Sequence, residues 1–372
     1  MLFIFLLLLI VLPDLYIWAS FIRENSLIFN ILYWIPTAII LVLMLIFLCN
    51  RSSSVLHVLL PIVICLSFPK LFFTAISLLG RGIAVFLPQV YGIGNTVGIA
   101  VFAISLIAAV YGCTAGWKRL HVSEQNFRFD TLPESFRGYK IVQISDLHLG
   151  TNGKDTHYIE RLVDRVNSVA PDMVVFTGDI INTDISETYP FTDILGRIKA
   201  KDGVFSVLGN HDYFIYGDAG MRKHNLEKLT AAERSMGWDL LLDESRFIKR
   251  GSDSIAIVGV EYIGKFTRHR GNLQKAMEDV VPGQFTILLT HDPWHWRHEV
   301  VPCTDIELTL SGHTHAAQLQ ICGFSPAQWI FQEWAGVYCS DSQILNISVG
   351  AGGTVPFRLG AWPEINIITL NK

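Results

Sequence analysis

The sequence predicts an N-terminal, multi-span α-helical membrane region followed by a soluble α/β domain. The first observation is the distribution of charge, because only six of the 62 charged residues (29 basic and 33 acidic) lie in residues 1–113. The second is a change of pattern from about Arg128, where short β-branched runs begin to alternate with amphipathic stretches. Strands that alternate with helices indicate an α/β fold with parallel sheet.

Four apolar stretches in the first region approach the roughly 20 residues that a spanning helix needs. They cover residues 1–22, 27–48, 55–79 and 92–113. We expect about four helices, and three or five also fit the pattern. The first stretch has no positively charged segment before its apolar run, which favours a membrane anchor over a cleaved signal peptide.

The third stretch contains Pro61, Pro69 and Lys70, so we expect a broken or tilted helix. A charged side chain at membrane depth is costly and is often functional. Two interpretations of Lys70 stay open: a functional residue, or one whose amine reaches the membrane surface along its aliphatic stem.

The few charges that flank the apolar stretches predict the orientation of the chain. With four spans, Arg51, Lys118 and Arg119 lie on the same side as the soluble domain, whereas Arg23 and Arg81 lie on the other. Because positive charge is enriched on the inner side, we expect a multi-pass protein of the cell or inner membrane with a cytoplasmic soluble domain.

Charge and cysteine usage exclude some classes of function. Residues 1–113 carry a net charge of +2 (four basic, two acidic), so the remainder carries −6 to give the total of −4. An acidic domain argues against a nucleic-acid partner. None of the six cysteines stands in a CxxC pair, which argues against a zinc knuckle or a redox motif. The oligomeric state is not indicated.

The soluble part is expected to begin with a linker at residues 114–137 and to continue as one domain over residues 138–372. A helix is predicted over residues 156–169, because Ile159, Leu162, Val163 and Val166 would share one face. The predicted strands are residues 139–145, 172–177, 204–208, 254–260, 285–290, 306–310, 343–349 and 364–370.

Five of these strands are followed at once by polar residues that can bind metals. In chain order the residues are Asp146 and His148, then Asp179, then Asn210, His211 and Asp212, then His291, and finally His313 and His315. Ligands bind at the carboxyl ends of the strands in open α/β sheets, so we expect these side chains to meet.

The residue types predict a centre for two divalent ions. In an extended strand, side chains two residues apart point to the same face. The two side chains of Asp146-x-His148 would therefore face one ion, and so would those of His313-x-His315. Glycines 178, 209 and 312 would allow sharp turns where the strands stop. Carboxylate, amide and imidazole ligands without thiolate suit manganese, iron or zinc. Two such ions can activate a water and stabilise an in-line displacement at phosphorus.

The motifs SDLH (145–148), GDIIN (178–182), GNHD (209–212), TH (290–291) and SGHTH (311–315) resemble those of the calcineurin-like metallophosphoesterase family, in the family's order. DLHLG, GNHDY and LSGHTH behind several spans resemble its membrane-associated YkuE-like subgroup. The resemblance covers residues 140–370 and implies a β-sandwich of two sheets flanked by helices. It also implies the role of each residue: Asp146, His148 and His315 hold one metal, Asn210, His291 and His313 hold the other, Asp179 bridges them, and His211 protonates the leaving oxygen.

The chain departs from the family's pattern in two places. Many members have aspartate at the position of Asn182, where it orients the catalytic histidine. Here the Asn182 amide oxygen or Asp184 would take that role, and Asn182 and Asp212 are expected to support the site. Close relatives often have two glycines where this chain has Ala316 and Ala317, whose methyl groups should narrow the approach to the site.

The resemblance implies a metal-dependent phosphoesterase that hydrolyses a phosphoester or pyrophosphate bond. Some members cleave UDP-diacylglucosamine in lipid A synthesis, which makes a lipid-linked substrate the most specific expectation. The aromatic-rich stretch with Trp329, Phe331 and Trp334 could enter the membrane surface or shelter an acyl chain, or fold onto the domain. The alternatives are a broad nucleotide or protein phosphatase, and a non-enzymatic metal-binding sensor or scaffold.

Overall fold

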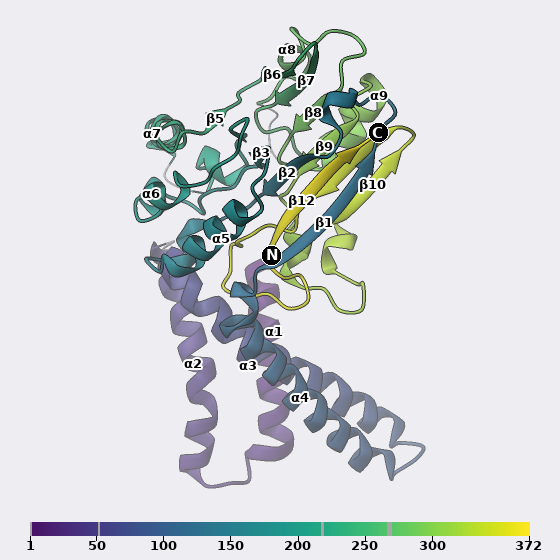
Figure 1. Ribbon diagram of the computed structural model, residues 1–372. Helices are drawn as coiled ribbons and strands as arrows, with labels where there is room; N and C mark the ends of the chain where they lie inside the picture. Colours follow the sequence, from purple (N-terminus) through teal and green to yellow (C-terminus); the bar gives the residue numbers. More distant parts are fainter. Residues whose placement is uncertain (1, 51–52, 217–218, 266–269) are drawn as a thin grey trace. The chain divides into compact units, whose positions relative to one another are not determined.

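The computed structural model describes residues 2–50, 53–216, 219–265 and 270–372, and most of its helices and strands are labelled in Figure 1. The chain divides into two compact units. The membrane unit comprises residues 1–116 together with 355–357, and the catalytic unit comprises residues 117–354 and 358–372.

The membrane unit consists of apolar helices. These are α1 (Leu2–Ile17), which a π-helical turn continues (Trp18–Ile22), α2 (Leu27–Asn50), α3 (Ser53–Ile83) and α4 (Val90–Thr114). Within the described residues, three helical stretches are long and apolar enough to cross a membrane, over Leu27–Cys49, Val55–Ile83 and Val90–Lys118, and Leu7–Ile22 is a shorter apolar helix. Of the two alternatives predicted for the third helix, a break is wrong, because α3 continues through both Pro61 and Pro69, and a tilt stays a prediction.

A polar cluster joins α1, α2 and α3 inside the membrane unit. The Asp14 carboxylate accepts hydrogen bonds from the hydroxyls of Tyr33 and Thr37, and it lies 2.7 Å from the Lys70 amine. The side chains of Asp14 and Lys70 are only 3% and 14% exposed. The charge of Lys70 is therefore neutralised by a carboxylate from another helix.

Replacing Lys70 by methionine is expected to destabilise the membrane unit by about 3–5 kcal/mol, because it leaves the Asp14 carboxylate buried without its counter-charge. Thermal unfolding of the full chain in detergent measures the effect. The double variant Asp14→Leu/Lys70→Met should recover most of the loss, and Arg81→Met, at an exposed cation, is the matched control. An unfolding temperature of Lys70→Met equal to that of the parent chain would contradict the expectation.

The catalytic unit contains two six-stranded sheets that mix parallel and antiparallel pairs. The first sheet has the order β1 (His121–Arg128), β12 (Glu364–Asn371), β2 (Tyr139–Ile144), β3 (Met173–Phe176), β4 (Val204–Ser206) and β5 (Asp239–Leu240). The second has the order β10 (Gly336–Ser340), β11 (Gln343–Ile347), β9 (Leu308–Ser311), β8 (Thr286–Leu289), β7 (Asp253–Gly259) and β6 (Glu244–Arg250).

The sheets pack face to face, with helices on their outer sides, as Figure 1 shows. Side chains along β2 point alternately to the two faces of the first sheet. Ile141 belongs to the apolar core between the two sheets, and Val142 belongs to the core between this sheet and its helices. The first sheet is covered by the helices α5 (His157–Ser168), α6 (Thr192–Leu195) and α7 (Arg222–Ser235). The second sheet is covered by α8 (Leu273–Ala276) and by a π-helical turn (Trp296–Val300) that continues into α9 (Val301–Cys303). The predicted two-sheet α/β fold is confirmed.

The segment 114–137 differs from the predicted linker. Residues His121–Arg128 form β1, which pairs in parallel with β12 along its whole length. Half of the positions of this strand are exposed, and only Phe127 is buried. An edge strand with so little burial has no strong apolar alternation, which is why the sequence pattern does not reveal it.

Candidate metal centre

The polar residues that follow five strands lie together in the structure. Three of these strands, β2, β3 and β4, are parallel neighbours in the first sheet, and two, β8 and β9, are parallel neighbours in the second. Parallel strands end at the same edge of a sheet, so each sheet presents its ligand-bearing loops along one edge. The site is therefore assembled from both halves of the sandwich.

The geometry of these loops is not the extended one that the sequence suggests. Asp146, His148, Asp179, His313 and His315 all adopt left-handed backbone conformations, with φ of 52°, 44°, 60°, 77° and 51°. Such a conformation costs a residue other than glycine about 1–2 kcal/mol. Its repetition at five of the seven expected ligand positions indicates that the fold holds these side chains for a function.

The glycines of the motifs act by allowing close approach as well as by turning. Gly178 has a positive φ of 94°, as expected for a turn. A Cβ atom on Gly209 would lie 2.1 Å from an Asp179 carboxylate oxygen, and one on Gly312 would lie 2.2 Å from an Asp146 carboxylate oxygen. Only glycine leaves room for these carboxylates.

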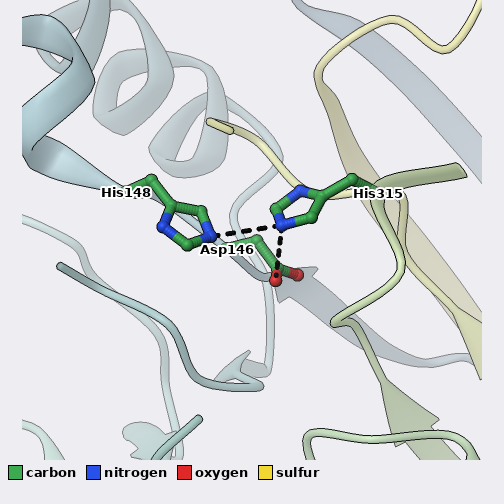
Figure 2. Close-up of side chains that lie close together, drawn as sticks. All are labelled: Asp146, His148 and His315. Carbon is green, nitrogen blue, oxygen red and sulfur yellow. Dashed lines mark hydrogen bonds and ion pairs between the residues drawn. The ribbon is translucent and has the colours of Figure 1, made fainter. Parts of the chain in front are cut away.

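Among the described residues, three groups of side chains have donor atoms that could hold a metal ion, and Asp146, His148 and His315 form the first. Figure 2 shows the two imidazoles turned toward one another above the Asp146 carboxylate. The Nε2 atoms of His148 and His315 are 3.1 Å apart, and His315 Nε2 lies 3.4 Å from Asp146 Oδ1. All three residues are buried.

Asp179, His291 and His313 form the second group. His291 Nε2 lies 3.1 Å from Asp179 Oδ2 and 3.2 Å from His313 Nδ1. Asp179 Oδ2 is also 3.7 Å from His148 Nε2, so this carboxylate lies between the two groups. The motif His313-x-His315 therefore divides between the groups. The expectation that both of its imidazoles face one ion is wrong.

The donor atoms fit a pair of divalent cations. The Oδ1 atom of Asn210 is buried and has no hydrogen-bond partner, which is costly unless a cation occupies the space that it faces. Burial lowers the pKa of His148 to about 3 and holds the pKa of His315 well below its usual value, so both imidazoles stay in the neutral form that can bind a metal.

The carboxylates show how charge is distributed in the site. Burial raises the pKa of Asp146 to about 6. Burial also opposes ionisation of Asp179, but the imidazoles of His291 and His211 outweigh it and hold its pKa well below the usual value. Conversely, the Asp179 carboxylate overrides the effect of burial on His291 and raises the pKa of that imidazole to about 10. A cation that binds here must displace the His291 proton.

His211 belongs to a third group with His148 and Asp179, but backbone contacts determine its orientation. Its Nδ1 atom lies 2.7 Å from the backbone carbonyl oxygen of Asn182, and its backbone N–H donates to Asp179 Oδ1 at 2.8 Å. The expectation that the Asn182 amide or Asp184 orients His211 is wrong. Asn182 donates from its amide to Thr151, and Asp184 caps the short helix that follows it.

The Asp212 carboxylate stabilises the loops that carry the ligands by accepting hydrogen bonds from their backbone. Its Oδ2 atom accepts from the backbone N–H groups of Asp179 at 2.7 Å and Gly209 at 2.8 Å, and its Oδ1 atom accepts from Ile180 at 2.9 Å. The side chain is fully buried. One carboxylate thus joins the loop after β3 to the loop after β4.

Asp292 is a site residue that the sequence interpretation missed, although it directly follows His291. Its buried carboxylate lies 3.5 Å from His313 Nε2, on the side of the ring opposite the nitrogen that faces His291. Tyr262 and the backbone N–H groups of Lys265 and Trp294 donate to it. A carboxylate behind a metal-binding imidazole fixes the tautomer and orientation of the ring.

Replacing Asp292 by asparagine is expected to weaken metal binding at His313 by about 10–100-fold, because the neutral amide removes the negative charge that faces the outer nitrogen of this imidazole. Metal titration of the purified full chain measures the two affinities. Asp239→Asn, at an exposed carboxylate paired with Arg246, is the control. Two unchanged affinities would exclude a role for Asp292 in orienting the ligand.

Arg358 is a second missed residue, and no motif in the sequence indicates it. The guanidinium is fully buried and donates to the backbone carbonyls of Val349, Gly352 and Ala361. Its Nη2 atom lies 3.4 Å from His315 Nδ1. Burial lowers its pKa to about 10. Arg358 therefore holds the loop between β11 and β12 against the metal ligands.

Ala316 and Ala317 continue the left-handed backbone of His315, with φ of 49° and 50°. Glycine would adopt this conformation without strain. The Ala316 side chain is buried, and only Ala317 is exposed.

Comparison with known proteins agrees with this fold and with the cluster of metal-binding groups. Residues 139–317 match the family model described as calcineurin-like phosphoesterase. Residues 1–117 match the model described as probable calcineurin-like phosphoesterase, transmembrane domain. The chain therefore combines a calcineurin-like phosphoesterase domain with the transmembrane domain described for such phosphoesterases.

Three relatives illustrate the similarity. A transmembrane protein with metallophosphoesterase domain from Danio rerio is 29% identical over 74% of this chain and 62% of its own length. The metallophosphoesterase YkuE of Bacillus subtilis is 29% identical over 68% of this chain and 86% of its own length. The UDP-2,3-diacylglucosamine pyrophosphatase LpxG of Chlamydia muridarum is 24% identical over 74% of this chain and 97% of its own length. The chain thus spans less than two thirds of the Danio rerio protein.

Proposed function

We propose that this membrane protein hydrolyses a phosphoester or pyrophosphate bond of a lipid-linked substrate at a centre of two divalent metal ions. The observation that carries the proposal is the position of Asp179. Its carboxylate lies 3.1 Å from His291 in one ligand group and 3.7 Å from His148, whose ring faces the other group. A carboxylate between two sets of imidazoles is suited to bridge two cations.

The two metal positions take different ligands in this proposal. Asp146, His148 and His315 hold the first ion, Asn210, His291 and His313 hold the second, and Asp179 bridges them. Manganese, iron and zinc suit these ligands. Such ions supply positive charge that attracts a phosphate and stabilises the charge developing on its oxygens.

His211 is the proton donor of the proposed reaction. Because Nδ1 of its ring faces the Asn182 carbonyl at 2.7 Å, this nitrogen carries a hydrogen, and Nε2 remains for the substrate. The carbonyl thereby orients the ring, so that Nε2 can pass a proton to the leaving oxygen.

Two observations support a lipid-linked substrate over a soluble nucleotide or a phosphoprotein. The same chain carries helices long and apolar enough to cross a membrane. The relative LpxG, which matches this chain over 97% of the LpxG length, is named for a diacylated sugar nucleotide. A UDP-diacylglucosamine-like pyrophosphate is accordingly the first substrate to test.

The test uses the full chain purified in detergent and assayed with Mn²⁺ against three substrates: a lipid-linked pyrophosphate, a soluble nucleotide and a phosphopeptide. We expect the lipid-linked substrate to have the highest kcat/KM. Chelation should abolish the activity and added metal should restore it. Higher activity on the nucleotide or phosphopeptide would establish the broad phosphatase instead. Metal binding without hydrolysis of any substrate would indicate the sensor or scaffold.

We also propose that the catalytic unit faces the cytoplasm. The positive charges of Lys118 and Arg119 directly follow the last apolar helix and support this orientation. Protease digestion of right-side-out membrane vesicles should leave the catalytic unit intact. Its digestion without permeabilisation would place it outside.

A further inference from the structure

The catalytic unit exposes an apolar patch on one loop, which we call the aromatic loop (residues 319–334). Ten large apolar side chains are exposed among the described residues of this unit, and four of them lie between positions 321 and 330. They are Ile321, Phe324, Trp329 and Ile330, with exposed fractions of 54%, 44%, 79% and 49%. The rings of Phe324 and Trp329 are in contact, with centroids 5.4 Å apart. Contiguous exposed apolar surface of this kind marks a site of interaction.

The aromatic loop is held firmly despite its exposed side chains. Ser325 donates from its hydroxyl to the Ala316 carbonyl, and Thr314 donates to the carbonyl of Trp334. The buried Glu333 carboxylate forms an ion pair with Arg297 at 2.5 Å, and the Lys265 amine donates to the Ile330 carbonyl at 2.7 Å. The loop therefore presents its apolar side chains in a fixed arrangement, rather than folding them onto the domain.

The same loop reaches the metal centre. The ring of Phe331 packs edge-on against the imidazole of His313, with centroids 5.5 Å apart. The two residues that anchor the loop, Thr314 and Ala316, directly flank His315 in the chain. Phe331 thus contacts a metal ligand and directly follows the exposed Trp329 and Ile330 in the chain.

The chain itself indicates what covers this patch. Its apolar helices place it in a bilayer, and only residues 115–120 separate the end of α4 from the start of β1. Tryptophan, with a large ring and one polar N–H, favours the boundary between headgroups and acyl chains. We propose that the aromatic loop inserts Trp329 and Ile330 into the surface of the bilayer that anchors the chain. A phosphorylated lipid can then reach the metal centre without leaving the membrane, an inference that rests on the proposed lipid-linked substrate.

The insertion is tested directly by photolabelling. The full chain is reconstituted into vesicles containing a phospholipid with a photoreactive group near the start of one acyl chain, and labelled peptides are identified by mass spectrometry. We expect labelling at Trp329 and Ile330 and none at Val281, which is 64% exposed elsewhere on the catalytic unit. Absence of label from the aromatic loop, with the membrane helices labelled, would overturn the proposal and leave a protein partner as the occupant of the patch.

The consequence for catalysis is tested with the double variant Trp329→Asp/Ile330→Asp. Its kcat/KM on a lipid-linked pyrophosphate in vesicles should fall by about tenfold, since charged side chains oppose insertion. Hydrolysis of a water-soluble aryl phosphodiester should be unchanged, and Val281→Asp should alter neither rate. Equal losses on both substrates, or no loss on either, would overturn the proposal. A parent chain that hydrolyses neither substrate would refute the proposed function, and the labelling pattern would still decide whether the loop inserts.

Discussion

Replacing His211 by alanine is expected to lower kcat by about 10²–10⁴-fold, the range in which general acid catalysis contributes. The metal content of the protein should not change. The contact between His211 and Asp179 Oδ1 runs through the backbone N–H, which alanine retains. Steady-state kinetics on the preferred substrate, together with elemental analysis of bound metal, measures both quantities. A variant with full metal content and unchanged kcat would remove His211 from the role of proton donor.

Two further variants separate the chemistry of His211 from its support. His224→Ala, at an exposed histidine of α7, controls for the loss of an imidazole elsewhere. Asn182→Ala keeps the backbone carbonyl that faces His211 Nδ1, so its loss of kcat should be at least about tenfold smaller than that of His211→Ala. Equal losses would mean that the Asn182 side chain, and not its carbonyl, positions the imidazole.

Replacing Asp212 by alanine is expected to lower the free energy of unfolding of the catalytic unit by about 3–6 kcal/mol. The variant leaves the buried N–H groups of Asp179, Gly209 and Ile180 without an acceptor, and each unsatisfied group costs about 1–3 kcal/mol. Because all three groups lie in the loops that carry the ligands, metal affinity should fall as well. Denaturant unfolding of the full chain measures the free energy of unfolding, and the loss of bound metal measures the change in metal affinity.

The control for Asp212 is Asp164→Ala, at an exposed carboxylate of α5, which should change stability by less than about 0.5 kcal/mol. Asp212→Asn should lie between the two, since one acceptor oxygen remains. Stability of Asp212→Ala within the range of the Asp164 control would show that the ligand loops do not depend on this carboxylate.

Buried strands were predictable from the sequence because their side chains must be apolar on both faces. The strands with four consecutive buried residues, such as Met173–Phe176 and Thr286–Leu289, were all predicted. The strands that escaped prediction are short or exposed, as in Asp239–Leu240 and His121–Arg128. Their pairing partners stabilise them, and a partner such as β12, more than 200 residues further along the chain, leaves no local signal.

The candidate site was predictable to the extent that its residues stand in short motifs after predicted strands. The arrangement of those residues was not predictable from strand parity, because left-handed residues interrupt the extended backbone at Asp146 and His313. Arg358 and the carbonyl of Asn182 act through contacts with distant residues or with the backbone, neither of which a side-chain pattern records. Asp292 could have been found, since a carboxylate beside a metal-binding histidine is a common supporting group.

The division of the ligands between the two sheets makes a bound cation a cross-link. His148 and His315 are separated by 167 residues, yet their ring nitrogens face each other across the site. An ion held between them closes a loop as long as many whole domains. In a chain-entropy description, a covalent closure of about 100 residues stabilises a fold by about 4–5 kcal/mol. A metal centre that joins the loops after β2 and β9 would therefore act as a reversible cross-link between the two sheets. Removing the metal would lower the stability of the fold as well as stop the proposed reaction.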